Sequence, residues 1–370
     1  MQVQIDFERK PLLFDQPEYI ISSYNSKTFY KAFNQIEKAL REGLYVAGLF
    51  SYEAGYFFEP CLKLDKKFDF PLILTGAYKQ PLKQKLKQDK SEGFSIQNLK
   101  LNISREKYAS HINIIRNHIR QGDVYQITYC LKFKFNYRGN PRELYLELLK
   151  RQPVPYPAYI STKDFSILSL SPERFIKKSD TFCITEPMKG TWMRKNDPFS
   201  NTLARKEFSN DPKNRAENVM IADLLRNDLG RIGQDVRAPR LFKIAKYKTL
   251  FQMTSIVTAN IKKDVGLYKL FSAIFPSGSV TGAPKIRAMQ IIKNLEQEER
   301  KIYTGAIGYI TPRRDLYFNI PIRTILIKSG QAEMGVGGGI VWDSTAKGEW
   351  EEGLLKAKFL TALASTPYID

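Results

Sequence analysis

The sequence predicts a mixed α+β fold, and three observations support this prediction. Stretches typical of β-strands follow one another in runs. Stretches typical of helices are inserted between these runs and do not alternate strictly with single strands, which argues against a doubly wound parallel sheet. Of the 370 residues, 43% are hydrophobic and 12% are aromatic, which is enough for a sizeable core.

A chain of this length is expected to form one large domain or two closely packed ones. We place the boundary between an N-terminal region, residues 1–95, and a larger part, residues 96–370. Within the N-terminal region, residues 44–58 are apolar and aromatic with interspersed glycines, which predicts a strand followed by a turn. Residues 79–93 are rich in Lys and Gln and are interpreted as a solvated connector, although the two parts can still share a core.

The first clear helix of the larger part begins after Ser104, a typical N-cap, and ends at Gly122. Its apolar residues recur at helical spacing: Tyr108, Ile112, Ile115 and Ile119. A strand follows, with aromatic and aliphatic residues on one face and polar residues such as Gln126 on the other.

The remaining elements are predicted from the same signals. Further strands are expected at 167–170 and 182–185, and helices at 216–229, 283–295 and 349–364. Residues 317–328 and 332–342 are predicted to form a hairpin that turns at Ser329-Gly330.

Composition excludes several classes of function. The net charge of +20 raises the possibility of nucleic-acid binding, but the lysines are scattered and no nucleic-acid-binding motif accompanies them. A positive field also favours a small dianionic substrate. No apolar stretch is long enough to cross a bilayer, and residues 1–10 contain no apolar signal core, so we expect a soluble cytoplasmic protein without membrane contact.

The few cysteines and histidines do not form a recognisable site. Cys61, Cys130 and Cys183 lie far apart and lack metal-ligand spacing, so they are interpreted as ordinary thiols. His111 and His118 share one predicted helix and have no acidic or thiol partners in a metal-binding pattern. A zinc site or a His-based triad is therefore not expected.

Two predicted helices carry carboxylates that are candidates for a metal site. Glu217 lies at the N-terminal end of an apolar stripe, and Glu349, Glu352 and Lys356 share one face of the last helix. Carboxylates from separate helices are typical Mg²⁺ ligands. Taken alone, however, this pattern is better explained by two solvated helix faces.

Two stretches of small residues are candidates for binding a ligand through the backbone. The cluster Gly335-Val-Gly-Gly-Gly339 matches neither a dinucleotide-binding motif nor a P-loop, and it indicates either close approach of a ligand or a bulge. The stretch 276–285 leads through Thr281 and Gly282 into Pro284, which suits the first turn of a helix. Free N–H groups there can bind a carboxylate, although an ordinary capped loop explains the stretch equally well.

Two basic residues complete the candidates. Arg323 lies in a predicted strand with apolar residues on both faces, so its guanidinium needs an anionic partner from the protein or from a substrate. Lys189 lies in a predicted Pro/Gly turn. By default it is a surface lysine, but an amine with a pKa lowered by burial can act as a nucleophile.

In order along the chain, these segments resemble the chorismate-utilising enzymes, the family of anthranilate, aminodeoxychorismate, isochorismate and salicylate synthases. The resemblance covers residues 100–365 and, more weakly, Ser51-Tyr-Glu-Ala-Gly55. The matching segments are Tyr125-Gln126, Ser171-Pro-Glu173, Pro187-Met-Lys-Gly-Thr191, Arg215-Ala-Glu-Asn-Val-Met220, Ser279-Val-Thr-Gly-Ala-Pro-Lys285, Ile322-Arg-Thr324, Gly337-Gly-Gly-Ile-Val341 and Glu349-Trp-Glu-Glu352. The ordered set is specific, and it favours the functional interpretation of each segment.

The resemblance implies a fold and a role for each candidate. The fold would consist of two large antiparallel sheets packed together with helices outside, and residues 96–370 would be the chorismate-binding catalytic domain. Glu217 and Glu352 would bind Mg²⁺, with Glu349 supporting through water, and Glu173 would be the general acid. Chorismate would be bound by Tyr303, Arg323, Gln126, Thr281, Gly282, Gly337, Gly338, Gly339 and Lys356.

Lys189 separates the branches of this family. Its Pro-x-Lys-Gly-Thr context resembles the aminodeoxychorismate synthases, in which the amine is thought to add to the ring before ammonia replaces it, whereas the other branches typically carry a small residue there. Gln126 agrees with this branch. The resemblance therefore implies amination of chorismate at C4 for 4-aminobenzoate and folate synthesis, and the alternative is the anthranilate synthase reaction.

The sequence contains no glutamine amidotransferase portion, so the resemblance implies that ammonia comes from a separate glutaminase subunit. No nucleic-acid partner is implied. Two positions depart from the family pattern: Gln252 stands where many relatives carry His, and Met193 replaces a frequent Pro.

Overall fold

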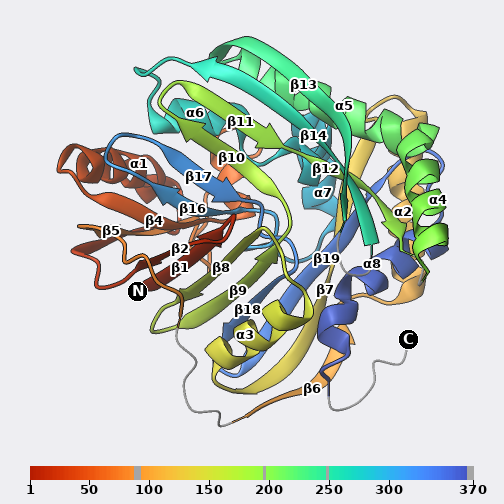
Figure 1. Cartoon of the computed structure of the whole chain (residues 1–370), viewed down its shortest axis with the longest axis horizontal. Helices are drawn as coiled ribbons and strands as arrows, with labels where there is room; N and C mark the ends of the chain where they lie inside the picture. The colour runs from red at the N-terminus through yellow and green to blue at the C-terminus, as the bar shows by residue number, and fades with distance from the viewer. Residues whose placement is uncertain (87–92, 195–196, 247–249, 365–370) are drawn as a thin grey trace.

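Two large antiparallel β-sheets form the framework of the protein in this computed structural model (Figure 1). The structure describes residues 1–86, 93–194, 197–246 and 250–364. A hydrophobic cluster joins residues of both sheets, such as Ile5 and Ile167 from the first and Leu49 and Ile307 from the second. The predicted α+β fold with two packed antiparallel sheets is therefore confirmed.

Within the described residues the first sheet has nine strands, and Figure 1 shows its long strands β7 and β19 running side by side. In spatial order it contains β15 (Gly282–Ala283), β7 (Gln126–Gly139), β19 (Gln331–Ile340), β18 (Thr324–Lys328), β9 (Phe165–Ser171), β8 (Tyr156–Ser161), β1 (Gln2–Phe7) and β2 (Lys10–Phe14), while β6 (Phe94–Leu101) pairs with β7.

The second sheet has ten strands in the part of the chain that the structure describes. In spatial order it contains β12 (Met188–Met193), β14 (Leu250–Ile261), β11 (Phe182–Glu186), β10 (Arg174–Ser179), β17 (Leu316–Asn319), β16 (Ala306–Ile310), β4 (Tyr45–Phe50), β5 (Ile73–Tyr78) and β3 (Tyr19–Ser23), while β13 (Gly233–Lys246) pairs with β14.

Helices pack against the two sheets. Helix α5 packs on β12, β13 and β14, α8 packs on β19, and α1 packs on β3 and β4. The helices are α1 (Ser26–Arg41), α2 (Arg105–Arg120), α3 (Pro141–Arg151), α4 (Pro198–Asn210), α5 (Pro212–Gly230), α6 (Leu267–Ile274), α7 (Lys285–Leu295) and α8 (Ala346–Thr361), with the short 3₁₀ helices η1 (Tyr52–Phe57) and η2 (Gly278–Val280).

Local sequence signals set several of these boundaries. The Ser104 hydroxyl caps α2 by accepting a hydrogen bond from the amide of Lys107, and Gly122, just past the end of that helix, has φ +78°. Ser329 and Gly330 have φ values of 49° and 75°, which are typical of a two-residue hairpin turn, and they join β18 to β19. The predicted start and stop of α2 and the predicted hairpin turn are confirmed.

The prediction of one continuous strand over residues 317–328 is wrong. Strand β17 ends at Asn319 in the second sheet, and β18 begins at Thr324 in the first sheet. Between them, Pro321 has no N–H to donate to a strand ladder, and Arg323 has φ +52°. The chain therefore crosses from one sheet to the other at Arg323, which is not part of a buried strand.

A second crossing lies beside the first. The chain leaves β9 at Ser171 and enters β10 at Arg174, so Glu173 lies between the sheets. The amide of Ile320 donates to the carbonyl of Glu173 (3.1 Å), and the Ser171 hydroxyl donates to the carbonyl of Ile320 (2.6 Å). These bonds fasten the two crossings together and bring Glu173 and Arg323 to the same region.

The N-terminal region contributes strands to both sheets. β1 pairs with β8 in the first sheet, and β4 pairs with β16 in the second. Residues 44–58 form β4 followed by the 3₁₀ helix η1, which replaces the predicted turn. Of the predicted connector 79–93, residues 87–92 lie outside the described residues.

Candidate active site

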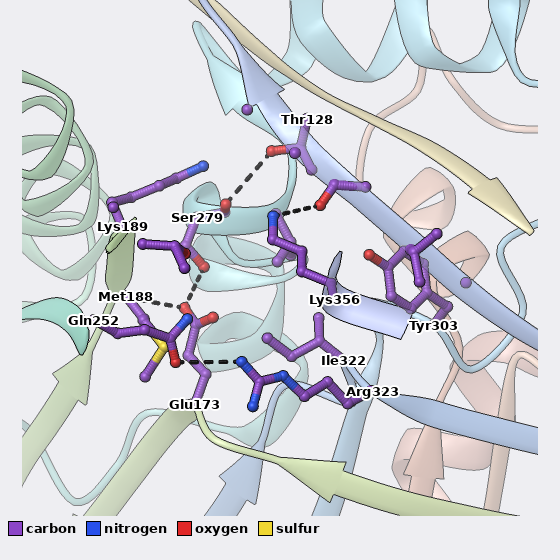
Figure 2. Close-up of a pocket in the computed structure, with 18 of the residues that line it drawn as sticks. Thr128, Glu173, Met188, Lys189, Gln252, Ser279, Tyr303, Ile322, Arg323 and Lys356 are labelled. Atoms are coloured by element: carbon purple, nitrogen blue, oxygen red, sulfur yellow. Dashed lines mark hydrogen bonds between the residues drawn. The ribbon is translucent and has the colours of Figure 1, made fainter. Parts of the chain in front are cut away.

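A cavity lies where the two sheets meet, next to the two crossings (Figure 2). Many of the predicted site residues line it, although they come from distant parts of the sequence: Glu173, Lys189, Glu217, Tyr303, Arg323, Gly337, Gly338, Gly339 and Lys356. The fold thus brings together two carboxyl groups, two amines and a guanidinium in one cavity.

Glu173 is almost fully buried in the wall of this cavity. The Ser279 hydroxyl donates to its Oε1 at 2.6 Å, and the amide of Met188 donates to the same oxygen at 3.3 Å (Figure 2). Burial nevertheless dominates and raises the pKa of Glu173 to about 7. A carboxyl group with such a pKa can hold a proton near neutral pH and release it during a reaction.

Lys189 does not lie in a surface turn, which corrects the prediction made from its Pro/Gly context. It lies in strand β12 and is only 9% exposed. Gly190, with φ +86°, shifts the register between β12 and β14 just after it. Burial lowers the pKa of the Lys189 amine, although the carboxylates of Glu217 and Glu173 partly oppose this, so a larger share of the amine is uncharged and nucleophilic.

Gln126 lies close to this amine. A Cβ atom at Gly339 would be 1.9 Å from Nε2 of Gln126 and 2.9 Å from Nζ of Lys189, so both groups meet at the backbone of Gly339. Gln126 is fully buried, and within the described part of the chain neither its amide nitrogen nor its amide oxygen has a hydrogen-bond partner. A buried amide in this state is well suited to bind a polar ligand.

Tyr303 and Arg323 also line the cavity. The ring of Tyr303 fills the space where a side chain at Gly335 would lie, with ring atoms 2.3 Å from the position of a Cβ atom. Arg323 donates a long hydrogen bond to Gln252 at 3.5 Å (Figure 2). A guanidinium and a phenol hydroxyl are both groups that can bind a carboxylate.

Three carboxylates are the candidate ligands for a metal ion. Glu217 lines the cavity from α5, while Glu349 and Glu352 reach Gly338 from α8, at 2.8 Å and 3.6 Å from the position of a Cβ atom there. Burial, reinforced by repulsion from Glu352, raises the pKa values of Glu217 and Glu349, as expected where a cation would stabilise the charged forms.

Glu352 is held differently from the other two carboxylates. Its Oε1 lies 2.6 Å from Nζ of Lys356, and this ion pair lowers the pKa of Glu352. Among the described residues no three such side chains already form a metal-binding cluster. The oxygen donors fit the chemistry of Mg²⁺, and Mg²⁺ binding stays a prediction.

Several predicted residues do not line the cavity directly. Thr281 is buried, and its hydroxyl donates to the carbonyl of Ser277 at 3.0 Å. Gly282 packs against the carbonyl of Gln126, which lies 2.2 Å from the position of a Cβ atom. Thr281 and Gly282 lie at the strand pair β15–β7, while Gln126, Glu349 and Glu352 lie against the glycines of β19, as Lys189 and Lys356 also do.

The structure adds residues that the predicted site lacks. Ser279 donates to Glu173, Thr128 donates to the carbonyl of Ser279 at 3.5 Å, and Gln252 accepts from Arg323. Thr128 lies on the polar face predicted for β7, on the same side of the strand as Gln126. That shared face is the signal that could have identified it.

Comparison with known proteins identifies the family. A family model described as chorismate binding enzyme matches residues 3–362. The chain belongs to this family, as the resemblance predicted. No helix in the described part of the chain is long and apolar enough to cross a membrane.

Members of more than one branch are similar to this chain. Aminodeoxychorismate synthase component 1 of Klebsiella aerogenes is 39% identical over 253 residues, which cover 68% of this chain and 56% of that protein. Anthranilate synthase component 1 of Aquifex aeolicus is 34% identical over 265 residues, which cover 71% and 54%. The chain thus spans about half the length of these curated relatives.

A solved structure shows the same fold. Anthranilate synthase component I of Streptococcus pneumoniae superimposes with a TM-score of 0.82 at 23% sequence identity, covering 97% of this chain and 92% of that one. The similarity confirms the fold, and the reaction has to be argued from the residues of the site.

Gly339→Ala provides a test of this geometry. The atoms nearest to the added methyl group would be side-chain atoms of Gln126 and Lys189, so we expect little change in stability but a loss of activity of about 100-fold, because both groups are pushed out of place. Thermal unfolding and the rate of chorismate consumption measure the two effects. Gly353→Ala in α8 is the control, since nothing lies within 4 Å of its Cβ position; equal activity of the two variants would contradict the geometry.

Proposed function

We propose that the protein aminates chorismate at C4, forming 4-amino-4-deoxychorismate. The observation that carries this proposal is the buried Lys189 amine, which lines the same cavity as the protonatable Glu173. Relatives named aminodeoxychorismate synthase component 1 at 36% to 39% identity support the same branch.

In the first step, the uncharged Lys189 amine adds to C2 of the chorismate ring. The ring double bonds shift, the bond between C4 and its hydroxyl oxygen breaks, and Glu173 gives its proton to the departing oxygen, so that water leaves. Protonation is needed because hydroxide is a poor leaving group. Ser279 and the amide of Met188 hold the Glu173 carboxyl in place for this transfer.

In the second step, ammonia adds at C4, the double bonds shift back, and the bond between C2 and the lysine nitrogen breaks. The lysine leaves as a neutral amine because its nitrogen has kept both protons, and the single proton then lost from the new ammonium group restores the one that Glu173 gave to form water. We place the ammonia beside Gln126, whose amide oxygen is available to accept a hydrogen bond from it.

Two groups of residues would bind the two carboxylates of the substrate. Tyr303 and Arg323 would bind the enolpyruvyl carboxylate of chorismate. Glu217 and Glu352, with Glu349 through water, would hold Mg²⁺, which when bound neutralises the carboxylate on the ring. Because the relatives are named as component 1 of their enzymes, we propose that ammonia comes from a separate glutaminase subunit and that the product feeds 4-aminobenzoate and folate synthesis.

The product decides between this reaction and its alternative. We expect the chain, incubated with chorismate, Mg²⁺ and ammonium at mildly alkaline pH, to form a product one mass unit lighter than chorismate. Addition of an aminodeoxychorismate lyase should then yield 4-aminobenzoate. Anthranilate formed without the lyase would instead identify the anthranilate synthase reaction. No turnover, even with a glutaminase subunit and glutamine, would refute both.

A further inference from the structure

The turn that carries Tyr303 is held in place by residues outside the cavity. Within this turn, Lys301 and Thr304 have φ values of 56° and 62°, a conformation that side-chain-bearing residues rarely adopt. The following Gly305 presses against the end of β4, since a Cβ atom there would lie 2.2 Å from the carbonyl oxygen of Phe50. Such a conformation persists only where the surroundings impose it.

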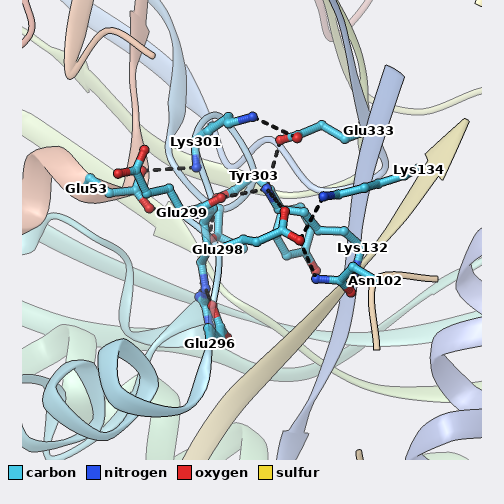
Figure 3. A network of polar contacts seen from close by, with 12 residues as sticks. Glu53, Asn102, Lys132, Lys134, Glu296, Glu298, Glu299, Lys301, Tyr303 and Glu333 are labelled. Carbon is cyan, nitrogen blue, oxygen red and sulfur yellow. Dashed lines mark hydrogen bonds and ion pairs between the residues drawn. The ribbon is translucent and has the colours of Figure 1, made fainter. Parts of the chain in front are cut away.

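Glu53, from the 3₁₀ helix η1 of the N-terminal region, binds the backbone of this turn. Its two carboxylate oxygens accept hydrogen bonds from the amides of Arg300 (2.7 Å) and Lys301 (3.0 Å), as Figure 3 shows for Lys301. The amide of Tyr52 donates to the carbonyl of Lys301 at 2.8 Å. Glu53 is buried, so these bonds form away from water. Burial also raises the pKa of its carboxyl to about 7, and the bonds are charge-assisted when the carboxyl is ionised.

The Arg300 side chain connects the same turn to the cavity wall. Its guanidinium binds both carboxylate oxygens of Glu296, at 2.6 and 2.7 Å. It also donates to the carbonyls of Val280 (2.9 Å) and Thr128 (2.7 Å) and to the Thr304 hydroxyl (3.3 Å). All five of its N–H donors are thus used.

Two of these acceptors lie at the cavity. Thr128 and Val280 both line it, and Val280 follows Ser279, the donor to Glu173. On the other side of the turn, Lys301 forms an ion pair with Glu333 of β19 at 2.8 Å (Figure 3). The turn is therefore fixed to η1, to β7, to β19 and to the loop that contains η2 and carries Ser279, here called the Ser279 loop.

We infer that Glu53 and Arg300 are positioning residues that hold Tyr303 and the Ser279 loop in the geometry needed to bind chorismate. The N-terminal η1 helix is then part of the machinery of the site, although it does not touch the cavity. The inference rests on the proposed function only in taking chorismate as the ligand.

The test is a double-mutant cycle between Glu53→Gln and Tyr303→Phe, read out by the Kd for chorismate in the presence of Mg²⁺ and by the KM for chorismate consumption. Glutamine keeps the shape of the side chain but replaces one acceptor with a donor facing a backbone N–H. We expect Glu53→Gln to raise Kd and KM by about tenfold or more, with a smaller change in kcat. In the Tyr303→Phe background its effect should be much smaller, because both changes act on the same contact.

The control is Glu18→Gln, a surface carboxylate of the same N-terminal region, paired with Lys79 at 3.2 Å. It should leave Kd and KM unchanged. If Glu53→Gln does not fold, Glu53→Asp retains the charge and tests the same position. A lower melting temperature with an unchanged Kd, or effects that add fully with those of Tyr303→Phe, would overturn the inference.

This test is independent of the product. Wild-type protein that binds chorismate but forms anthranilate would refute the proposed function, and the cycle would still decide the role of Glu53. Failure of wild-type protein to bind chorismate would refute both.

Discussion

Replacing Lys189 with methionine is expected to lower the formation of 4-amino-4-deoxychorismate by at least about three orders of magnitude. Methionine has nearly the same length and suits the buried position in β12, so the fold should persist while the amine is lost. Product formation measured by mass, together with a thermal unfolding curve, separates lost chemistry from lost structure.

The protein itself offers a matched control for this variant. Lys178 of β10 is also buried, and burial also lowers the pKa of its amine, but its Nζ donates to the carbonyl of Arg314 at 3.2 Å, outside the cavity. Lys178→Met should therefore retain the activity of the folded protein. An unchanged rate in Lys189→Met would eliminate the covalent role of Lys189.

A second measurement tests the covalent step directly. Without ammonia, the second step cannot take place, so wild-type protein incubated with chorismate and Mg²⁺ should gain the mass of chorismate less one water. Lys189→Met should gain no such mass. An adduct of the same mass on the variant would place the nucleophile elsewhere.

Local features of the fold were predictable from the sequence because they depend on neighbouring residues. The cap at Ser104, the end of α2 at Gly122 and the turn at Ser329-Gly330 each require only a few residues and the backbone geometry they favour. The crossing at Arg323 was not predictable in this way. The apolar neighbours of Arg323 fit a buried strand equally well. Only the position of the second sheet decides where the chain stops pairing with one sheet and passes to the other.

In the candidate site, too, local features were predictable from the sequence and long-range contacts were not. Glu173, Lys189 and Arg323 were found through an ordered set of motifs, but the burial of Lys189 follows from α5 and β14 packing around β12, which its own Pro/Gly context does not reveal. The roles of Glu53 and Arg300 depend on a contact between residues 53 and 300, and local sequence patterns carry no information at that separation.

Replacing Glu173 with glutamine is expected to slow the reaction by about 10²- to 10⁴-fold, because the amide keeps the shape of the acid but cannot give a proton to the departing hydroxyl. Ser279 can still donate to the amide oxygen, so the wall of the cavity should be preserved. Glu186→Gln is the control: this carboxylate of β11 lies nearby but pairs with Arg174 at 3.5 Å and Lys243 at 3.4 Å and does not line the cavity. It should retain most of the activity.

The pH dependence of the rate gives an independent check on Glu173. An acid is active in its protonated form, which is present below its pKa, and burial raises the pKa of Glu173 to about 7. The wild-type rate constant for the first step should therefore fall as the pH rises through about 7, while at lower pH it is limited by protonation of Lys189. In Glu173→Gln the fall above pH 7 should disappear from the residual rate, since the group that titrates there is gone. If that fall persists in the variant, another group supplies the proton, and the assignment of Glu173 as the acid fails even if the variant is slow.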